Sequence, residues 1–428
     1  MTSKSTAFND IGVSYTLPPP VETAAVSAIP TPSTPLASWI EVFLPFSGNI
    51  KLREMMLSTD HKTIKLSRLL EMLDSMAGDV AMKHTRAKRT AQGFDLTLVT
   101  ACVSGLSCCS RIDILRNYSL QGYVSYVGTS AMEVCIEIIQ DPLTEEETSL
   151  STIYFTMVGL DPATNKAVPV PQLILQTQYD EDLYNSGKTR SYQKKLKSKD
   201  SLSIKGPKDD ETQLIHGLYL DSIKLKEAMN EFHRSKQQQQ QQYTVEGDLA
   251  KAFVAEAPDK NRTWVKDTIH KNLLLMHSQN MNVNGKIFGG YIMRKSFESA
   301  HLSSTLFYGT NDIQFSYVDD IQFVRPVHVG SVIEFVTHVA YSRRGHCVTH
   351  CNCYELDIVT NIRSLTNVLH YVFKVSNADT GLEGDSGNGD ESSDAKKEFV
   401  EVIPREYKEI LAYLEGKRTL DNVLGIVS

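Results

Sequence analysis

The sequence predicts an α+β protein built from two copies of one unit, and three observations predict it. Segments 39–185 and 263–418 each begin with an extended stretch, continue into one helix with an apolar stripe, and end in several β-like runs. Outside these segments the composition changes to that of tails, linkers and loops. The order of elements repeats although sequence identity between the halves is weak, which indicates duplication.

The first unit is expected to contain a helix over residues 65–80. Its apolar residues recur at the spacing of one buried helical face: Leu66, Leu69, Leu70, Leu73, Met76 and Ala77. The β-like runs that follow cover residues 94–103, 121–127, 131–139 and 152–159.

The second unit is expected to contain a helix that starts at Gly289 and Gly290, with Met293, Phe297 and Ala300 on one stripe. Alternating apolar residues then predict strands near 313–317, 333–339 and 369–375.

The remaining segments are expected to be irregular. Residues 1–38 form a proline-rich disordered tail, and residues 186–262 form a linker with a basic run, a helical segment and polyglutamine. An acidic loop at 376–397 interrupts the second unit, and 419–428 is a C-terminal tail.

Composition excludes several classes. Lys+Arg 44 against Asp+Glu 51 gives a net charge of -7, which argues against a general nucleic-acid binder. No apolar run is long enough to span a bilayer. Seven scattered cysteines argue against a disulfide-stapled secreted fold and favour a reducing compartment.

The most informative stretch is an asparagine-rich loop over residues 276–288 that closes with Gly289 and Gly290 at the start of a helix. Glycines there allow a ligand close to the backbone, and the free N–H groups of the first turn favour negative charge. The site would suit a phosphate or the developing oxyanion of an acyl group.

The string N-x-x-G-x-x-F-G-G, formed by Asn282, Gly285, Phe288, Gly289 and Gly290, resembles the signature of hotdog-fold acyl-CoA thioesterases. Further segments are similar to the double-hotdog thioesterase 9 type of that family: 68–74, 264–268, 318–331 and 402–407.

The resemblance implies a tandem double hotdog, in which two antiparallel sheets each wrap around a central helix and the halves pair as a pseudo-dimer. It also implies hydrolysis of fatty acyl-CoA to free fatty acid and CoA, with no metal and no cofactor apart from the CoA of the substrate. A homo-oligomer is expected, with no nucleic-acid partner. The family implies a mitochondrial location, with the cytoplasm as the alternative because the first arginine is Arg53.

The resemblance places Asp74 at the catalytic acid position. Asp74 also lies at the edge of the apolar stripe, where partial desolvation raises the pKa of a carboxyl group and suits a general base or nucleophile. Asn282 matches the loop asparagine that orients water or holds the thioester carbonyl, with Asn280 and Asn284 as alternatives. A turn-forming role is the other interpretation of Asn282.

The halves depart from the family pattern in complementary ways. Residues 65–68 stand where the first half should have its double glycine, and Phe297 occupies the acid position of the second half, followed by Glu298. We therefore expect one complete site, in which Asp74 faces the Asn282 loop with amide donors at Gly289 and Gly290. Glu298 is a second candidate acid in a degenerate site.

Three arginines are candidate substrate contacts: Arg325, Arg343 and Arg344. The last two can equally form a solvated hairpin turn. The His/Cys run over 346–353 lacks a C-x2-C spacing and predicts a β-strand in preference to a zinc site. No G-x-S-x-G motif supports a serine hydrolase. Two alternatives stay open, a non-catalytic acyl-CoA sensor or scaffold and a hotdog hydratase or dehydratase.

Overall fold

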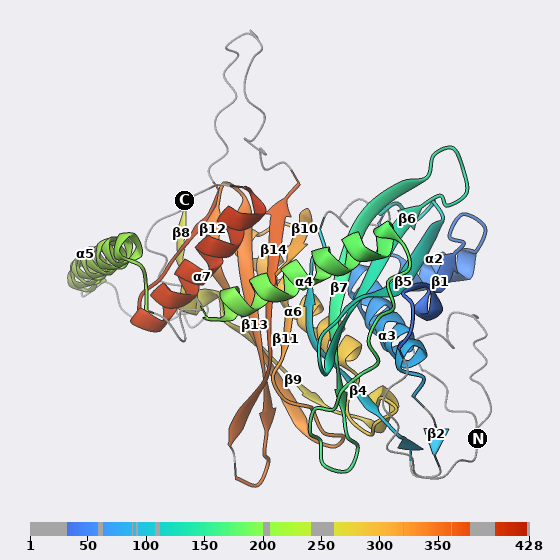
Figure 1. The fold of residues 1–428 in the computed structure, drawn as a ribbon. Coiled ribbons are helices and arrows are strands. Elements are labelled where there is room, and N and C mark those ends of the chain that lie inside the picture. Colours follow the sequence, from blue (N-terminus) through green and yellow to red (C-terminus); the bar gives the residue numbers. More distant parts are fainter. Residues whose placement is uncertain are drawn as a thin grey trace.

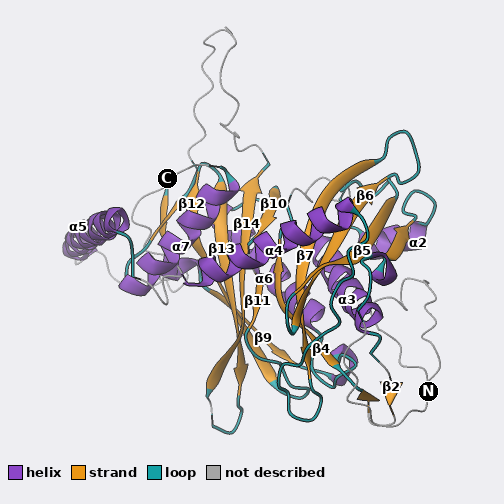
Figure 2. Cartoon of the chain, viewed as in Figure 1, coloured by secondary structure: helices purple, strands orange, loops and turns teal. Residues whose placement is uncertain are grey.

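The computed structural model describes residues 32–58, 63–87, 89–90, 93–107, 112–199, 206–240, 261–319, 321–360, 362–376 and 399–425. Over these residues the fold is mixed α+β, as predicted, and strands of both halves belong to one large antiparallel sheet (Figures 1 and 2). Most of the predicted N-terminal tail and acidic loop, and the end of the glutamine tract, lie outside the described residues. None of the described helices is long and apolar enough to cross a membrane.

The first half supplies five neighbouring strands of the large sheet, in the order β1-β5-β6-β7-β4. Its elements are η1 (Leu36–Ser38), β1 (Ile40–Leu44), α2 (Ile50–Met56), α3 (Leu66–Thr85), β2 (Arg89–Thr90), β3 (Gly93–Phe94), β4 (Thr97–Ser104), β5 (Tyr118–Val127), β6 (Ala131–Gln140) and β7 (Thr148–Leu160). The predicted helix and the four predicted β-runs are confirmed within a few residues.

The second half repeats this arrangement in the order β9-β12-β13-β14-β11, and β10 also pairs with β14. Its elements are β8 (Arg262–Trp264), η3 (Val265–Thr268), β9 (His270–Leu275), η4 (Ser278–Asn280), α6 (Gly289–Tyr308), β10 (Ile313–Val318), β11 (Ile321–Phe323), β12 (Val332–Arg343), β13 (His346–Leu356), β14 (Arg363–Val375), β15 (Glu401–Ile403) and α7 (Tyr407–Val423).

The two halves join edge to edge through β4 and β11, where Val103 pairs with Ile321 and Cys102 with Gln322 in antiparallel register. The strand order on one side of this junction mirrors the order on the other. Helices α3 and α6 also pack against each other. Each has 20 residues, and each is followed by a residue in the left-handed region, Arg86 or Gly309.

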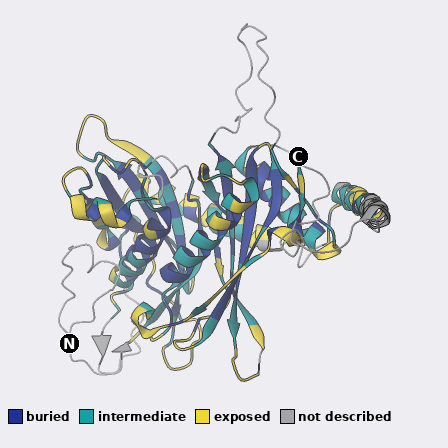
Figure 3. Ribbon diagram, turned by 180° about the vertical axis from the view of Figure 1, so that it is seen from behind, coloured by how far each residue is buried: buried dark blue, intermediate teal, exposed yellow. Residues whose placement is uncertain are grey.

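Helix α3 is buried along its predicted apolar stripe, dark blue in Figure 3. It lies directly on β5 because Gly122 has no side chain: a Cβ atom there would come within 2.9 Å of Met76 and 3.0 Å of Val80. Close packing of the stripe on the sheet is therefore fixed by residue size as well as by polarity.

Helix α4 (Gln178–Lys199) corrects the prediction that the basic run from 187 is irregular. Its cations have partners in both halves: Arg190 pairs with Glu133 at 2.7 Å, and Lys197 pairs with Asp319 at 2.5 Å. The helix crosses the junction between the halves (Figure 1). Its residues lack an apolar stripe, so ion pairs and the contact of Tyr184 with Tyr126 hold it in place.

Helix α5 (Asp209–Gln240) follows and is joined to α7 by paired contacts between Arg418 and Glu211. Helix α7 corrects the predicted tail from 419, because it continues to Val423. Leu420 is buried there, and Thr419 donates a hydrogen bond to Asp319 at 2.9 Å. The C-terminal residues through 423 are therefore part of the packed structure.

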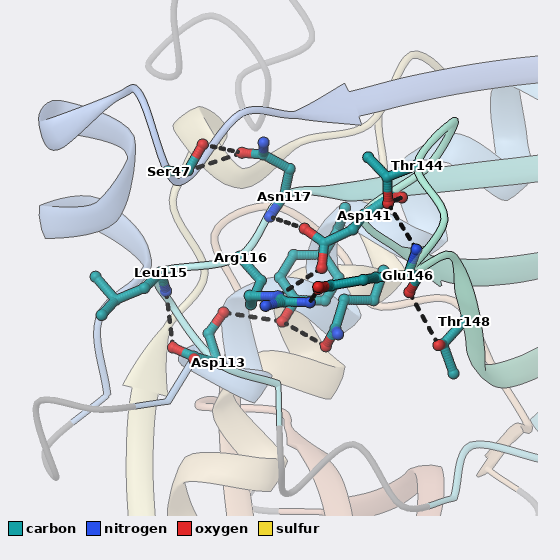
Figure 4. Close-up of polar contacts among 11 residues, drawn as sticks. Ser47, Asp113, Leu115, Arg116, Asn117, Asp141, Thr144, Glu146 and Thr148 are labelled. Atoms are coloured by element: carbon teal, nitrogen blue, oxygen red, sulfur yellow. Dashed lines mark hydrogen bonds and ion pairs between the residues drawn. The ribbon is translucent and has the colours of Figure 1, made fainter.

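A polar cluster centred on Arg116 fastens the connection before β5 to the β6–β7 hairpin (Figure 4). Arg116 pairs with Asp141 at 2.5 Å and with Glu146. The side-chain oxygen of Asn117 accepts a hydrogen bond from the Ser47 hydroxyl at 2.8 Å. These contacts have a structural role at the rim of the first half.

Candidate active site

Asp74 lies on α3, is 2% exposed, and faces the first residues of α6. A Cβ atom at Gly289 would be 3.1 Å from Asp74 Oδ2, and one at Gly290 would be 2.6 Å from the Phe288 ring. The backbone N–H of Gly290 donates a hydrogen bond to the Asp74 carboxylate. Two glycines are thus needed for the helix start to approach the acid this closely.

The Asp74 carboxyl group has a second partner on β4. Thr100 Oγ1 donates a hydrogen bond to Asp74 Oδ1 at 2.8 Å. Burial raises the pKa of Asp74 to about 6, while the bonds from Thr100 and Gly290 oppose that rise and the nearby charge of Glu71 adds to it. A carboxyl group with this pKa is partly protonated near pH 6 and available as a base above it.

The loop before α6 is held by an Asx-type turn at Asn282. Its side-chain oxygen accepts hydrogen bonds from the backbone N–H of Asn284 at 2.9 Å and of Lys286 at 3.1 Å. These bonds fix the orientation of the side-chain amide, so its Nδ2 group faces away from the turn. The structural role of Asn282 is therefore observed directly, and it is compatible with donation to a ligand by Nδ2.

Asn284 brings the same loop onto the first half. Its Nδ2 donates to the carbonyl oxygen of Leu98 on β4 at 3.4 Å, two residues from Thr100. The third asparagine of the loop, Asn280, accepts the backbone N–H of Phe288 at its carbonyl oxygen, at 2.9 Å. The structure thus brings together Asp74, the asparagine loop and the two glycines from opposite halves.

Glu298, the second candidate acid, has different surroundings. It pairs with Lys295 at 3.0 Å and with Lys65 at 3.6 Å, and it accepts a hydrogen bond from Ser67 at 3.2 Å. Burial alone would raise the pKa of Glu298, but the two lysines outweigh burial and lower it. Its carboxylate is therefore an ion-pair partner at the start of α3.

Phe297 occupies the position in α6 that Asp74 occupies in α3. Its ring is buried and contacts the rings of Phe315, Tyr371 and Phe373 at centroid distances of 5.4 to 5.7 Å. An aromatic cluster fills the place where a second acid would stand.

Of the three candidate arginines, Arg325 lies apart from the adjacent pair Arg343 and Arg344. Arg325 is exposed, two residues after Phe323, whose ring packs against Gly289. Arg343 is the last residue of β12 and lies 3.8 Å from Asp421 of α7, and Arg344 begins the turn that follows. The loop before α6 is bonded near the start of β12, where the Met276 N–H donates to the Ser331 carbonyl. The 12 residues of β12 then run from Val332 to Arg343. A strand of this length spans about 35 Å, so the turn lies at the far end of β12 from the loop before α6. The structure therefore does not bring this turn to Asp74.

The His/Cys run forms β13, as predicted. Cys347, Cys351 and Cys353 are buried in the sheet core. Among the described residues, no group of three or more His, Cys, Asp or Glu side chains is placed to hold a metal ion.

Sequence reasoning missed two features of the site. Thr100 sits 26 residues from Asp74 in an ordinary strand pattern, and nothing local marks it as a partner. Glu71 is 7% exposed and binds Arg294 of α6 at 3.0 Å, one helical turn before Asp74. A charged residue inside the apolar face of residues 66–77 was the available signal for Glu71.

The arrangement combines a buried carboxylate of raised pKa, a helix N-terminus with close backbone access, and an oriented side-chain amide. Together these groups can activate a water molecule and stabilise negative charge on an oxygen beside it. This is the class of site that acyl hydrolases use.

Two relatives of similar sequence support this class. The chain is 26% identical over 389 residues to human acyl-coenzyme A thioesterase 9, mitochondrial, covering 91% of this chain and 78% of that protein. It is 27% identical over 384 residues to mouse acyl-coenzyme A thioesterase 10, mitochondrial, covering 89% and 76%. Among solved structures, an acyl-ACP thioesterase from Bacteroides thetaiotaomicron matches with 9% identity and a TM-score of 0.43, over 80% of this chain and 100% of that one. No family model matches the chain.

The chain is thus homologous to proteins named acyl-CoA thioesterases. The resemblance predicted from the sequence is confirmed for the particular type as well, since proteins named thioesterase 9 and thioesterase 10 align with about nine tenths of the chain.

Proposed function

We propose that this protein is an acyl-CoA hydrolase, which converts a fatty acyl-CoA thioester and water to a free fatty acid and CoA. One observation carries the proposal: Asp74, buried on one half, is hydrogen-bonded to the glycine-rich start of α6 on the other half. The similarity to acyl-CoA thioesterases over nine tenths of the chain supports the choice of substrate.

In the proposed reaction the Asp74 carboxylate takes a proton from a water molecule as that water attacks the thioester carbonyl carbon. The carbonyl oxygen becomes an oxyanion, stabilised by the N–H of Gly289 and the Nδ2 group of Asn282. Collapse of the intermediate breaks the carbon–sulfur bond, and the thiolate of CoA leaves and takes up a proton. Direct attack by Asp74 on the carbonyl carbon, followed by hydrolysis of the anhydride, is the variant of this route.

Gly290 and Gly289 have different roles in this mechanism. Its N–H is engaged with the Asp74 carboxylate, so it orients the base, and Gly289 is the proposed oxyanion donor. No metal or redox cofactor enters the proposed steps. Arg325 is the proposed phosphate contact for CoA, since it is exposed and follows the strand that packs against Gly289.

We also propose that the two halves are tandem hotdog domains, at 39–185 and 263–418, paired as a pseudo-dimer. The mirrored strand order, the β4–β11 junction and the packing of α3 against α6 support this assignment. Assembly of several chains into a homo-oligomer is proposed with it, to be measured by sedimentation.

The proposed location is the mitochondrion, because the two thioesterases compared above are named mitochondrial. Imaging a fluorescent fusion of residues 1–50 tests it, and a cytoplasmic signal from the fusion and from the full chain would refute it.

A free-thiol assay across saturated acyl-CoA chain lengths tests the reaction. The full chain is expected to release CoA, and Asp74→Asn is expected to lose that release while keeping its fold and its affinity for acyl-CoA. Turnover that survives unchanged in Asp74→Asn would refute the site. Saturable acyl-CoA binding without thiol release by the wild type would favour a non-catalytic sensor.

A further inference from the structure

An ion pair joins equivalent positions of the two central helices. Helix α3 starts at Leu66 and α6 at Gly289, so Glu71 and Arg294 are each the sixth residue of a 20-residue helix. Arg294 donates to Glu71 Oε2 at 3.0 Å, and Arg68 reaches the same oxygen at 3.0 Å. Both Glu71 and Arg294 have side chains at most 13% exposed. The pair thus lies at the crossing of the helices that carry the proposed site.

This pair lies directly beside the proposed base. Glu71 precedes Asp74 by three residues on the same buried face of α3. A Cβ atom at Gly290 would lie 3.0 Å from the backbone oxygen of Glu71, so the residue that holds Asp74 rests on the Glu71 backbone.

A neighbouring carboxylate disfavours the ionisation of a carboxyl group, and a cation that pairs with the neighbour reduces this effect. Arg294 and Arg68 are placed to neutralise Glu71, and among the described groups the charge of Glu71 acts on Asp74 in the direction of a higher pKa. The partners of Asp74 from other elements, Thr100 of β4 and the Gly290 amide of α6, carry no charge.

We propose that Glu71 and Arg294 are positioning residues that set the protonation of Asp74, Glu71 by its charge and Arg294 by cancelling that charge. This inference rests on the proposed function in assigning Asp74 as the base. It goes beyond that function by assigning roles to two residues that do not touch the reacting atoms.

The pH dependence of kcat/KM distinguishes this role from a structural one. Breaking the bridge from either end removes the same contact, so a purely structural role changes both variants alike. A charge-setting role predicts opposite shifts. Arg294→Gln leaves Glu71 less compensated and moves the acidic limb to higher pH by about one unit, whereas Glu71→Gln moves it to lower pH. The double variant returns the limb close to its wild-type position.

Graded variants complete the experiment. Arg294→Lys keeps the charge and is expected to retain the wild-type limb. Arg68→Gln removes a more exposed partner, so a smaller shift in the direction of Arg294→Gln is expected, and it serves if Arg294→Gln does not fold. Arg190→Gln breaks a partly buried ion pair between α4 and Glu133 of β6 and is the matched control, with lower stability and an unmoved limb.

A direct titration separates failure of this inference from failure of the proposed function. Protein labelled with ¹³C at the aspartate carboxyl carbons is titrated by NMR, and Asp74→Asn identifies the Asp74 signal. Opposite shifts of that signal in Arg294→Gln and Glu71→Gln, without thioester hydrolysis, would support the charge relation and refute the function. Shifts in one direction, or none, would overturn the inference whether or not the enzyme is active.

Discussion

The two central helices place an acid at nearly the same position, yet the two acids have opposite surroundings. Asp74 of α3 meets the uncharged, glycine-rich start of α6, and its pKa is raised to about 6. Glu298 of α6 meets the start of α3, where Leu66 and Ser67 stand in place of the two glycines. Lys65 and Ser67 contact its carboxylate, and its pKa is lowered. The pairing helix N-terminus, more than the acid itself, therefore decides whether a carboxylate becomes a proton acceptor or an ion-pair partner.

This difference has a chemical consequence. A lysine-paired carboxylate is stabilised as an anion and is a weaker base, whereas a desolvated carboxylate near neutrality takes a proton readily. The ring of Phe297 also fills the position equivalent to Asp74 in the second half. A duplicated unit thus supports one site of the proposed type and one structural cluster.

Replacing each of the two acids tests this difference most directly and has the largest expected effect. Asp74→Asn is expected to lower kcat by about 10²- to 10⁴-fold, the usual contribution of a general base. Glu298→Gln is expected to change kcat by less than about threefold, since its carboxylate serves ion pairs whose loss costs stability instead. Steady-state thiol release at pH 8 measures both, and equal losses in the two variants would contradict the division of roles.

The same two variants are expected to change stability in opposite directions. The raised pKa of Asp74 means that its stabilising effect is complete below the unfolded value of 3.8 and is lost as the pH rises through about 6. At pH 7.5 the buried Asp74 carboxylate is ionised and destabilises the fold, and Asp74→Asn removes this charge. The free energy of unfolding of the variant at pH 7.5 should therefore exceed that of wild type by up to about 3 kcal/mol.

For Glu298 the pH dependence of stability has the opposite sign, because its pKa is lowered in the fold. Its ionised carboxylate stabilises the fold above the unfolded pKa of 4.5, and this stabilisation is lost as the pH falls through the folded pKa. Glu298→Gln should therefore be less stable at pH 7.5, by about 0.5 to 1 kcal/mol. Urea unfolding at pH 7.5 and pH 4.5 checks both. A destabilised Asp74→Asn at pH 7.5 would be inconsistent with a desolvated carboxylate.

The helix starts can be tested in the same paired way. Gly290→Ala adds a Cβ atom 2.6 Å from the Phe288 ring and 3.0 Å from the Glu71 backbone oxygen, which forces α6 away from Asp74. A displacement of about 1 Å is expected to lower kcat about 10²-fold. Ser67→Ala, at the equivalent position of α3, removes one hydrogen bond to Glu298 and should leave kcat within about twofold while costing about 1 kcal/mol of stability. Kinetics and thermal unfolding of both variants provide the comparison.

The sequence predicts the parts of this comparison that are local. The apolar stripe of α3, the glycine start of α6 and the absence of an acid at Phe297 all follow from residue spacing and the family resemblance. The β-runs are found because alternation marks a strand with one buried face. Those features identify the elements and the candidate acid.

Contacts that depend on packing cannot be predicted in this way. The bond from Thr100 to Asp74 and the pairing of Arg294 with Glu71 join residues 26 and 223 positions apart, and they exist only once the sheet and the helix crossing are formed. Helix α4 escapes prediction for a related reason. Its residues lack an apolar stripe, and partners such as Glu133 and Asp319 are supplied by distant strands and loops.

Replacing Thr100 is the smallest of these changes, because Thr100 bonds Asp74 and makes no contact with Glu298. Its hydrogen bond at 2.8 Å stabilises the ionised carboxylate and lowers the pKa that burial raises. Thr100→Val keeps the shape of the side chain and removes this donor, so the acidic limb of kcat/KM should move to higher pH by about one unit, equivalent to about 1.4 kcal/mol.

Activity of Thr100→Val well above the new limb should recover most of its wild-type value, which distinguishes a shifted base from a lost one. A pH profile from 5 to 9 measures both quantities, with Thr156→Val on β7 as a matched strand control, since Thr156 bonds Lys194 of α4. An unmoved limb in Thr100→Val would mean that the Gly290 amide alone holds the carboxylate, and the glycine start of α6 would then account for the whole difference between the two acids.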